Sequence, residues 1–145
     1  MNTFFQEVRE FNQTFGLPVK SGPVVDSNLR DRLVLFKKII SDEVNEVDEI
    51  IAKLDGETID PLEVLTDVAD WLGDIVVYCT SESVRLGIPM EDVLRLIMHS
   101  QYSKLVDSKP LIRDGKVQKG PNFVAPEPRI RALLNSIRYA KGLQE

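Results

Sequence analysis

Residues 28–54 read NLRDRLVLFKKIISDEVNEVDEIIAKL, and their apolar positions recur at the spacing of an amphipathic helix. At about 100° per residue, one arc of this helix carries seven apolar side chains: Leu33, Phe36, Ile40, Val44, Val47, Ile51 and Leu54. Asp26 or Ser27 is a suitable N-cap, and Asp55-Gly56 is a suitable end. The stretch predicts one long helix over about Asn28–Leu54, which needs helical partners to cover its apolar arc.

Helical patterning also dominates on both sides of this stretch, and we find no alternating strand pattern of useful length. Further helices are expected over about residues 3–15, 61–86, 90–106 and 129–141, with Thr58 or Asp60 as the cap before Pro61. Residues 107–128 are rich in Pro, Gly and basic side chains and are expected to form an ordered basic loop or short hairpin. The prediction is one all-α domain over residues 1–145, a four- to five-helix bundle.

Composition limits the classes of protein to consider. A chain of 145 residues, 43% hydrophobic and 28% charged, can bury one core, and no apolar run approaches the roughly 20 residues of a membrane span. The acidic start MNTFFQEVREF does not resemble a signal peptide. One cysteine, Cys79, cannot form an internal disulfide, and one histidine, His99, excludes His-rich zinc sites. We therefore expect a cytoplasmic protein without a membrane partner.

The charges are distributed unevenly along the chain. Residues 1–103 hold 9 Lys and Arg against 19 Asp and Glu, whereas residues 104–145 hold 9 against 4. An acidic body argues against binding to a nucleic-acid polymer, because such binding needs positive charge across the main body. An acidic body with a basic tail suits a site that binds cations and phosphates together.

One acidic side chain interrupts the apolar arc of the 28–54 helix. Glu43 falls inside the arc, in the heptad column of Phe36, and Glu46 lies at its edge. Because burying an ionised carboxylate without a partner is costly, Glu43 needs a counter-charge or a metal ion. Solvated positions are expected for three neighbouring acids: Asp42, Asp48 and Glu49.

The 61–86 helix carries a second acidic set. Its main apolar face holds Leu65, Val68, Ala69, Leu72, Ile75, Val76 and Cys79. The opposite face holds Asp67, Asp70 and Asp74, interleaved with Trp71 and Tyr78. Because this face is half apolar, we expect the helix to be covered on both sides, its aspartates lining a cleft or a subunit interface. A homodimer or a dimer of dimers would provide the cover.

The two acidic sets together predict a cation site. Antiparallel helices pack about 8–10 Å apart, so Glu43 and Glu46 can face Asp70 and Asp74 across the gap. Four converging carboxylates repel one another unless a hard divalent cation compensates them; Mg²⁺ is the expected ion and Mn²⁺ the other candidate. The alternative is a set of salt bridges with nearby basic residues: Arg30, Arg32, Lys37, Lys38 or Arg85. That alternative explains a single acid better than two pairs at helical spacing.

Short motifs along most of the chain resemble those of the all-α nucleoside triphosphate pyrophosphohydrolases, the superfamily of MazG, phosphoribosyl-ATP pyrophosphohydrolase and the dimeric dUTPases. VREF at 8–11 and FGLP at 15–18 resemble the N-terminal helix and turn of the MazG-like branch, and DEVNE at 42–46 resembles its EExxE motif. DVADWLGDIVVY at 67–78 resembles the ExxD motif, with LGI at 86–88 fixing the register. QYSK at 101–104 resembles NxSK, and DGKVQKGPNF at 114–123 resembles a GKxxKxPxF-like tail.

The ExxD motif departs from the family pattern in one place. In this register Asp74 matches the family's Asp, and Trp71 stands where the family has Glu. We expect Asp70, one helical turn before Asp74, to take over that ligand role, with Asp67 as its competitor. Trp71 itself either stacks on a base or fills the helix interface, and core packing is the commoner role.

The resemblance implies a MazG-like bundle that hydrolyses a nucleoside triphosphate between its α and β phosphates, releasing a monophosphate and pyrophosphate. Its metal ligands would be Glu43, Glu46, Asp70 and Asp74, with Asp67 as a further possibility; Glu43 and Glu46 would share ligand and base duties. The same resemblance implies that Lys104, Lys116 and Lys119 meet phosphate oxygens. Asn122 either contacts substrate or shapes the turn before Phe123.

Two other interpretations stay open. The first is a non-catalytic interaction protein whose acidic cleft is a structural or metal-stabilised dimer interface; in that protein the missing motif Glu reflects lost activity. The second is an enzyme restricted to one substrate, similar to a dUTPase or to a phosphoribosyl-ATP-specific hydrolase. The sequence carries no signature that identifies a base.

Overall fold

The computed structural model describes residues 1–142, so the last three positions of the predicted domain 1–145 lie outside the described residues. The described chain is mainly helical, with a single two-stranded sheet, which confirms the all-α prediction. It forms two compact units: residues 1–17 with 25–82, and residues 18–24 with the chain from Ser83 onward. Within residues 1–142, no helix combines the length and the apolar character needed to span a membrane.

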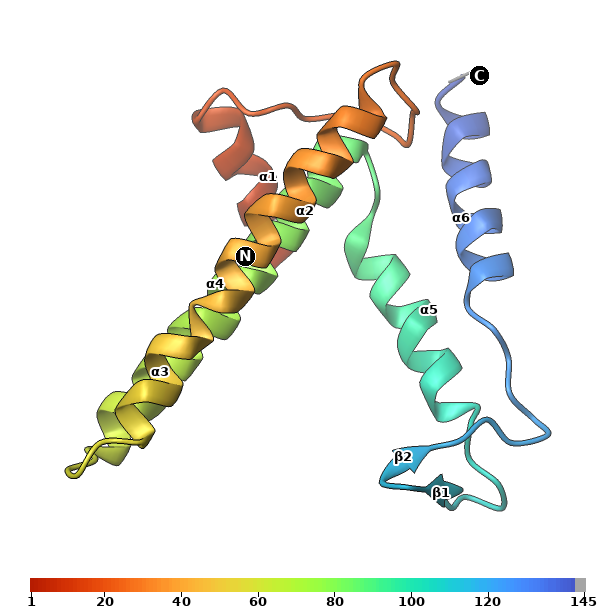
Figure 1. The fold of residues 1–145 in the computed structure, drawn as a ribbon. Helices are drawn as coiled ribbons and strands as arrows, with labels where there is room; N and C mark the ends of the chain where they lie inside the picture. Colours follow the sequence, from red (N-terminus) through yellow and green to blue (C-terminus); the bar gives the residue numbers. More distant parts are fainter. Residues whose placement is uncertain (143–145) are drawn as a thin grey trace. The chain divides into compact units, whose positions relative to one another are not determined.

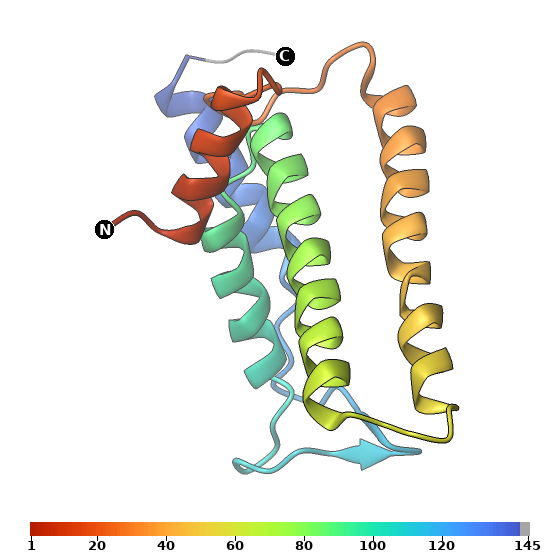
Figure 2. The ribbon, with the colours of Figure 1, turned by 90° about the vertical axis from the view of Figure 1, so that its left-hand side faces the viewer.

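The first unit contains α1 (Phe4–Thr14), α2 (Leu29–Asn45), α3 (Val47–Leu54) and most of α4 (Pro61–Leu86). The chain leaves α3 through a short loop, and α4 returns antiparallel alongside α2 and α3 (Figures 1 and 2). Asp60 is one of the two residues predicted to cap α4, and it does so: its Oδ1 accepts a hydrogen bond from the backbone N–H of Leu62 at 3.0 Å. The predicted limits of α4 are confirmed.

The predicted helix over 28–54 is wrong in one respect, since the structure divides it into α2 and α3 at Glu46. The Glu46 N–H donates to the carbonyl of Glu43, three residues earlier, at 3.2 Å. That same carbonyl accepts the indole N–H of Trp71 from α4 at 2.9 Å. A side-chain donor that enters the hydrogen-bond ladder of a helix is a known cause of such a break.

Polar contacts fasten the first unit near the end of α4. The Asn12 side chain is fully buried and exchanges two hydrogen bonds with Ser81: its Oδ1 accepts the Ser81 hydroxyl at 2.7 Å, and its Nδ2 donates to the Ser81 carbonyl at 3.2 Å. The Arg32 guanidinium donates Nε–H and Nη2–H to the buried Glu82 carboxylate, at 2.9 and 2.5 Å. These contacts hold α1 and α2 to α4.

Within the first unit, the apolar face of α4 is not covered as the sequence analysis expected. Leu65, Leu72 and Val76 are 64%, 50% and 52% exposed, and Cys79, expected on the packed face, is exposed as well. A helix face with this much apolar surface is typical of a packing interface. The predicted homodimer therefore stays a prediction.

The second unit contains α5 (Met90–Tyr102), β1 (Ile112–Arg113), β2 (Lys116–Val117) and α6 (Glu127–Ala140). The two strands form an antiparallel hairpin, which confirms one of the two structures predicted for 107–128. Asp114 and Gly115 join them with φ angles of 51° and 72°, values typical of a tight hairpin turn. α6 packs beside α5 (Figure 1), where Arg129 Nη1 lies 2.8 Å from His99 Nδ1.

Two ends of helices in this unit have local causes. α5 stops at Tyr102, four residues before the predicted end, because the Ser103 hydroxyl donates to the Ser100 carbonyl at 2.6 Å and accepts the Val124 N–H at 2.9 Å. α4 ends at Gly87, whose φ of +72° favours glycine. A side chain at Gly87 would also collide with the Gly22 carbonyl, so the 18–24 segment passes close to this turn.

Candidate functional site

A pocket of about 160 Å³ lies in the first unit, between α3 with the end of α2 and the first half of α4. We call it the acidic pocket, and its lining is Glu46, Glu49, Ile50, Lys53, Asp67, Asp70, Trp71 and Asp74. The structure thus brings together five residues predicted for the site: Glu46, Asp67, Asp70, Trp71 and Asp74. The predicted facing of two acidic sets on antiparallel helices is present.

Glu43 is buried beside this pocket, as predicted from its place in the apolar arc. Only 7% of the residue is exposed, and its Oε1 atom has no hydrogen-bond partner in residues 1–142. Burial raises the pKa of the Glu43 carboxyl, and the negative charges of Glu46, Asp74 and Asp70 raise this pKa further. The side chain is therefore a buried acid that lacks the counter-charge its ionised form requires.

Asp67 differs from the other predicted ligands because it has a basic partner. Lys53, in the last turn of α3, places its Nζ 2.5 Å from Asp67 Oδ2 and 3.2 Å from Glu63 Oε1. The salt-bridge alternative is therefore correct for Asp67, although its partner is a lysine that the alternative did not include. Asp42 is paired in the same way, with Lys38 at 2.8 Å.

Four predicted ligands have no basic partner in the described part of the chain, and we call them the open carboxylates: Glu43, Glu46, Asp70 and Asp74. The charges of Glu46, Asp70 and Asp74 raise the pKa of the fourth member, the buried Glu43. Asp67 is not among the causes of this shift. The pocket thus has an open end, formed by these four groups, and an end where Lys53 holds Asp67. Of the two candidates Asp70 and Asp67, Asp70 is thus the one without a basic partner in residues 1–142.

The open carboxylates suit a hard divalent cation by their chemistry. All their donors are carboxylate oxygens, and Glu43 Oε1 is a buried oxygen without a partner. In residues 1–142 no three His, Cys, Asp or Glu side chains converge into a ready-made metal centre.

The sequence analysis left two roles open for Trp71: stacking on a base or packing in the helix interface. In the structure it has a structural role. Its indole is partly buried, and its Nε1 donates to the Glu43 carbonyl at 2.9 Å while the ring lines the acidic pocket. This bond fixes α4 against the break between α2 and α3. Trp71 therefore helps to set where Glu43 and Glu46 lie, and one part of its ring still faces the pocket.

The predicted phosphate-binding residues all lie in the second unit. Lys104 Nζ donates to Gln101 Oε1 at 2.6 Å, and Lys119 Nζ lies 4.7 Å from the centre of the Phe123 ring. Lys116 is exposed on β2. Asn122 is exposed in a turn closed by the Phe123 N–H and the Gly120 carbonyl at 3.2 Å, which is the turn-shaping position considered for it.

Two residues of the acidic pocket were missed from the sequence. Glu49 was expected to be solvated and to point away from the site; it is exposed as expected, but it lines the pocket. Lys53 was not considered. Its signal was available: Lys53 lies seven residues after Glu46, two helical turns along the same face.

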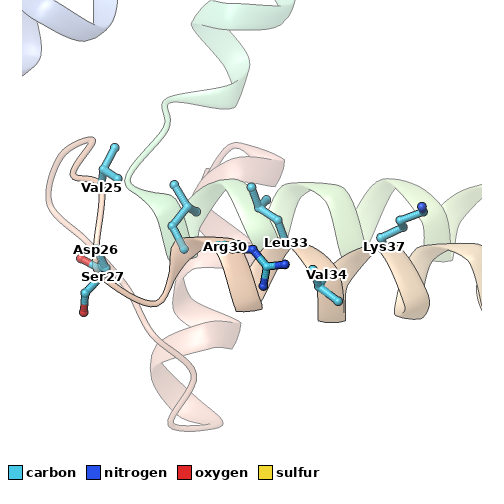
Figure 3. A pocket seen from close by; sticks show the side chains of 8 residues that line it. Val25, Asp26, Ser27, Arg30, Leu33, Val34 and Lys37 are labelled. Atoms are coloured by element: carbon cyan, nitrogen blue, oxygen red, sulfur yellow. The ribbon is translucent and has the colours of Figure 1, made fainter.

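A second hollow, of about 670 Å³, lies at the start of α2 and has mainly apolar walls (Figure 3). Its lining is Val25, Asp26, Ser27, Leu29, Arg30, Leu33, Val34 and Lys37. It presents one carboxylate where the acidic pocket presents five. The acidic pocket is therefore the better candidate for cation chemistry.

No protein-family model matches the chain, and no curated protein sequence matches it.

Proposed function

We propose that the chain is a Mg²⁺-dependent nucleoside triphosphate pyrophosphohydrolase, which cleaves its substrate between the α and β phosphates. The observation that carries the proposal is the unpartnered oxygen of Glu43, buried beside three further carboxylates that also lack basic partners. A protein that buries such a group gains most when a cation binds there. The order of the motifs along the chain supports the class of reaction.

In this proposal Mg²⁺, with Mn²⁺ as a substitute, is held by the open carboxylates. When bound, the ion neutralises charge on the phosphate oxygens. Glu43 and Glu46 share the task of accepting the proton of the attacking water. The water oxygen forms a bond to the α phosphorus, and the bond from that phosphorus to the bridging oxygen breaks, so that pyrophosphate leaves with the electron pair.

The basic residues of the second unit are assigned to the substrate by the family resemblance. Lys104, Lys116 and Lys119 would offset charge on the departing pyrophosphate. Trp71 presents part of its ring to the pocket, which supports a contact with the base of the nucleotide. Asn122 is assigned to the turn before Phe123.

We also propose a cytoplasmic homodimer or a dimer of dimers as the working form. The exposed apolar side chains of α4 support this assembly, since Leu65, Leu72 and Val76 repeat on one face of the helix. A nucleic-acid polymer and a membrane are not part of the proposal.

The deciding experiment is a product assay with Mg²⁺ across the eight common ribo- and deoxyribonucleoside triphosphates. Monophosphate plus pyrophosphate is the expected result, and diphosphate plus phosphate would contradict the proposal. The Glu43→Gln variant should lose activity by about 100-fold or more, because an amide cannot replace a ligand or base carboxylate. Glu57→Gln, which removes an exposed carboxylate from the α3–α4 loop, is the matched control and should retain full activity.

The non-catalytic interpretation has one specific observation in its favour. Trp71 stands where the motif of the resembled family has Glu, and its N–H donates a structural hydrogen bond to the Glu43 carbonyl. A protein of that kind would be stabilised by Mg²⁺ against heat yet hydrolyse none of the eight nucleotides. The same assay, with melting temperatures measured in parallel, separates the two functions.

A further inference from the structure

We propose that the Lys53 ammonium is a built-in cation that holds the Asp67 end of the acidic pocket, so that the pocket binds one divalent cation and not two. The inference rests on the metal-binding part of the proposed function. It concerns the number of ions and the residue that limits it.

The position of Lys53 carries the argument. Its Nζ contacts Asp67 Oδ2 at 2.5 Å and Glu63 Oε1 at 3.2 Å, and these two acids lie one turn apart on α4. Lys53 reaches them from the last turn of α3, where the helix dipole favours a cation. The side chain thus bridges α3 and α4 in the pocket wall.

The charges of the lining residues limit how many metal ions the pocket can hold. Five carboxylates and one ammonium line the pocket, and Glu43 is buried beside them. The open carboxylates can share one divalent ion. Beyond the open carboxylates, the lining offers a second ion only Glu49 and Asp67. Lys53 already holds Asp67, and its positive charge repels the ion.

A phosphate-binding role suits Lys53 less well. An ammonium group has three donors, and two of them are used by Asp67 and Glu63. These two acids also offset its charge before any phosphate arrives. A lysine in this state neutralises acids at its own end of the pocket and leaves the opposite end for the metal.

The test counts Mn²⁺ ions bound per chain, by titrating the purified full chain and following free Mn²⁺ by electron paramagnetic resonance. The wild type should bind one ion, and Lys53→Met should bind two, because Asp67 and Glu63 become available. The matched control is Lys38→Met, which breaks the 2.8 Å pair with Asp42 on α2, away from the pocket. This control should bind one ion, like the wild type.

Combining Lys53→Met with Asp67→Asn should return the number of bound Mn²⁺ ions to one per chain, since the added site loses its ligand. Circular dichroism checks that each variant is folded, and Lys53→Gln provides the same test if the Met variant does not fold. A count of one in both wild type and Lys53 variants, or of two in the wild type, would overturn the inference and leave the proposed function standing. A wild type that binds no Mn²⁺ would overturn both.

Discussion

The buried carboxylate of Glu43 sets the electrostatics of the acidic pocket at the scale of single residues. Its raised pKa, caused first by burial and then by Glu46, Asp74 and Asp70, means that the folded protein binds a proton there more tightly than the unfolded chain does. Stability is therefore lost as the pH rises from the ordinary pKa of glutamate through the raised value in the folded state. A metal ion bound at the open carboxylates would reverse that loss.

The first prediction follows for the metal-free protein. Glu43→Gln should melt a few degrees above the wild type at pH 7, because the amide carries no charge that burial can penalise. The difference should shrink as the pH falls below the raised pKa and vanish near the ordinary pKa of glutamate. Calorimetry over this pH range measures it, with Glu57→Gln as the control. Equal melting temperatures at pH 7 would contradict this account of Glu43.

The second prediction separates the two candidate substitutes for the motif Glu. Asp70→Asn should reduce turnover by about 100-fold, because Asp70 is an open carboxylate. Asp67→Asn should retain most of the activity, since Asp67 is already held by Lys53. Steady-state assays at saturating Mg²⁺ compare them. An inactive Asp67→Asn protein beside a fully active Asp70→Asn protein would reverse the assignment.

At the scale of elements, the bond between Trp71 and the Glu43 carbonyl joins α4 to the point where α2 ends. Trp71→Phe keeps an aromatic ring but removes the N–H donor and the five-membered ring of the indole. The third prediction is a loss of at least about 1 kcal/mol in the free energy of unfolding, the usual contribution of one such hydrogen bond, with the lost packing added to it. Urea unfolding measures it, and Tyr78→Phe, which removes an exposed hydroxyl from the same helix, should change stability by less.

The helices themselves could be predicted because their signals are local. Apolar periodicity located α2 through Leu33 and Phe36, and Asp60 with Pro61 located the start of α4. The burial of Glu43 followed from the same periodicity. These features depend on neighbours three or four residues apart, which a helical wheel represents well.

The break at Glu46 and the pairing of Lys53 could not be predicted in this way. The break depends on a donor from Trp71, twenty-eight residues from the carbonyl it reaches. The Lys53–Asp67 pair joins two helices across a loop, and only the relative rotation of those helices brings the side chains together. Such contacts are tertiary, and no local pattern specifies them.

At the scale of the whole molecule, the apolar face of α4 that the first unit leaves exposed is the surface for which we propose a contact between chains. The fourth prediction is that the chain sediments at twice its 16.4 kDa mass or at a higher multiple. Val76→Glu should shift it towards the single chain, because a charge would enter the apolar contact. Val117→Glu adds the same charge to an exposed valine of β2 and should leave the assembly unchanged. A wild type that sediments as a single chain would contradict the proposed dimer.

Trp71 is the only tryptophan of the chain, and its ring forms part of the acidic pocket while its N–H is bonded to the Glu43 carbonyl. The tryptophan fluorescence of the unlabelled protein therefore comes entirely from Trp71, in the lining of the acidic pocket. An ion or a nucleotide that enters the pocket changes the field around the indole and should change its emission. The molecule thus carries its own optical probe of occupancy, placed where no attached dye could report without disturbing the site.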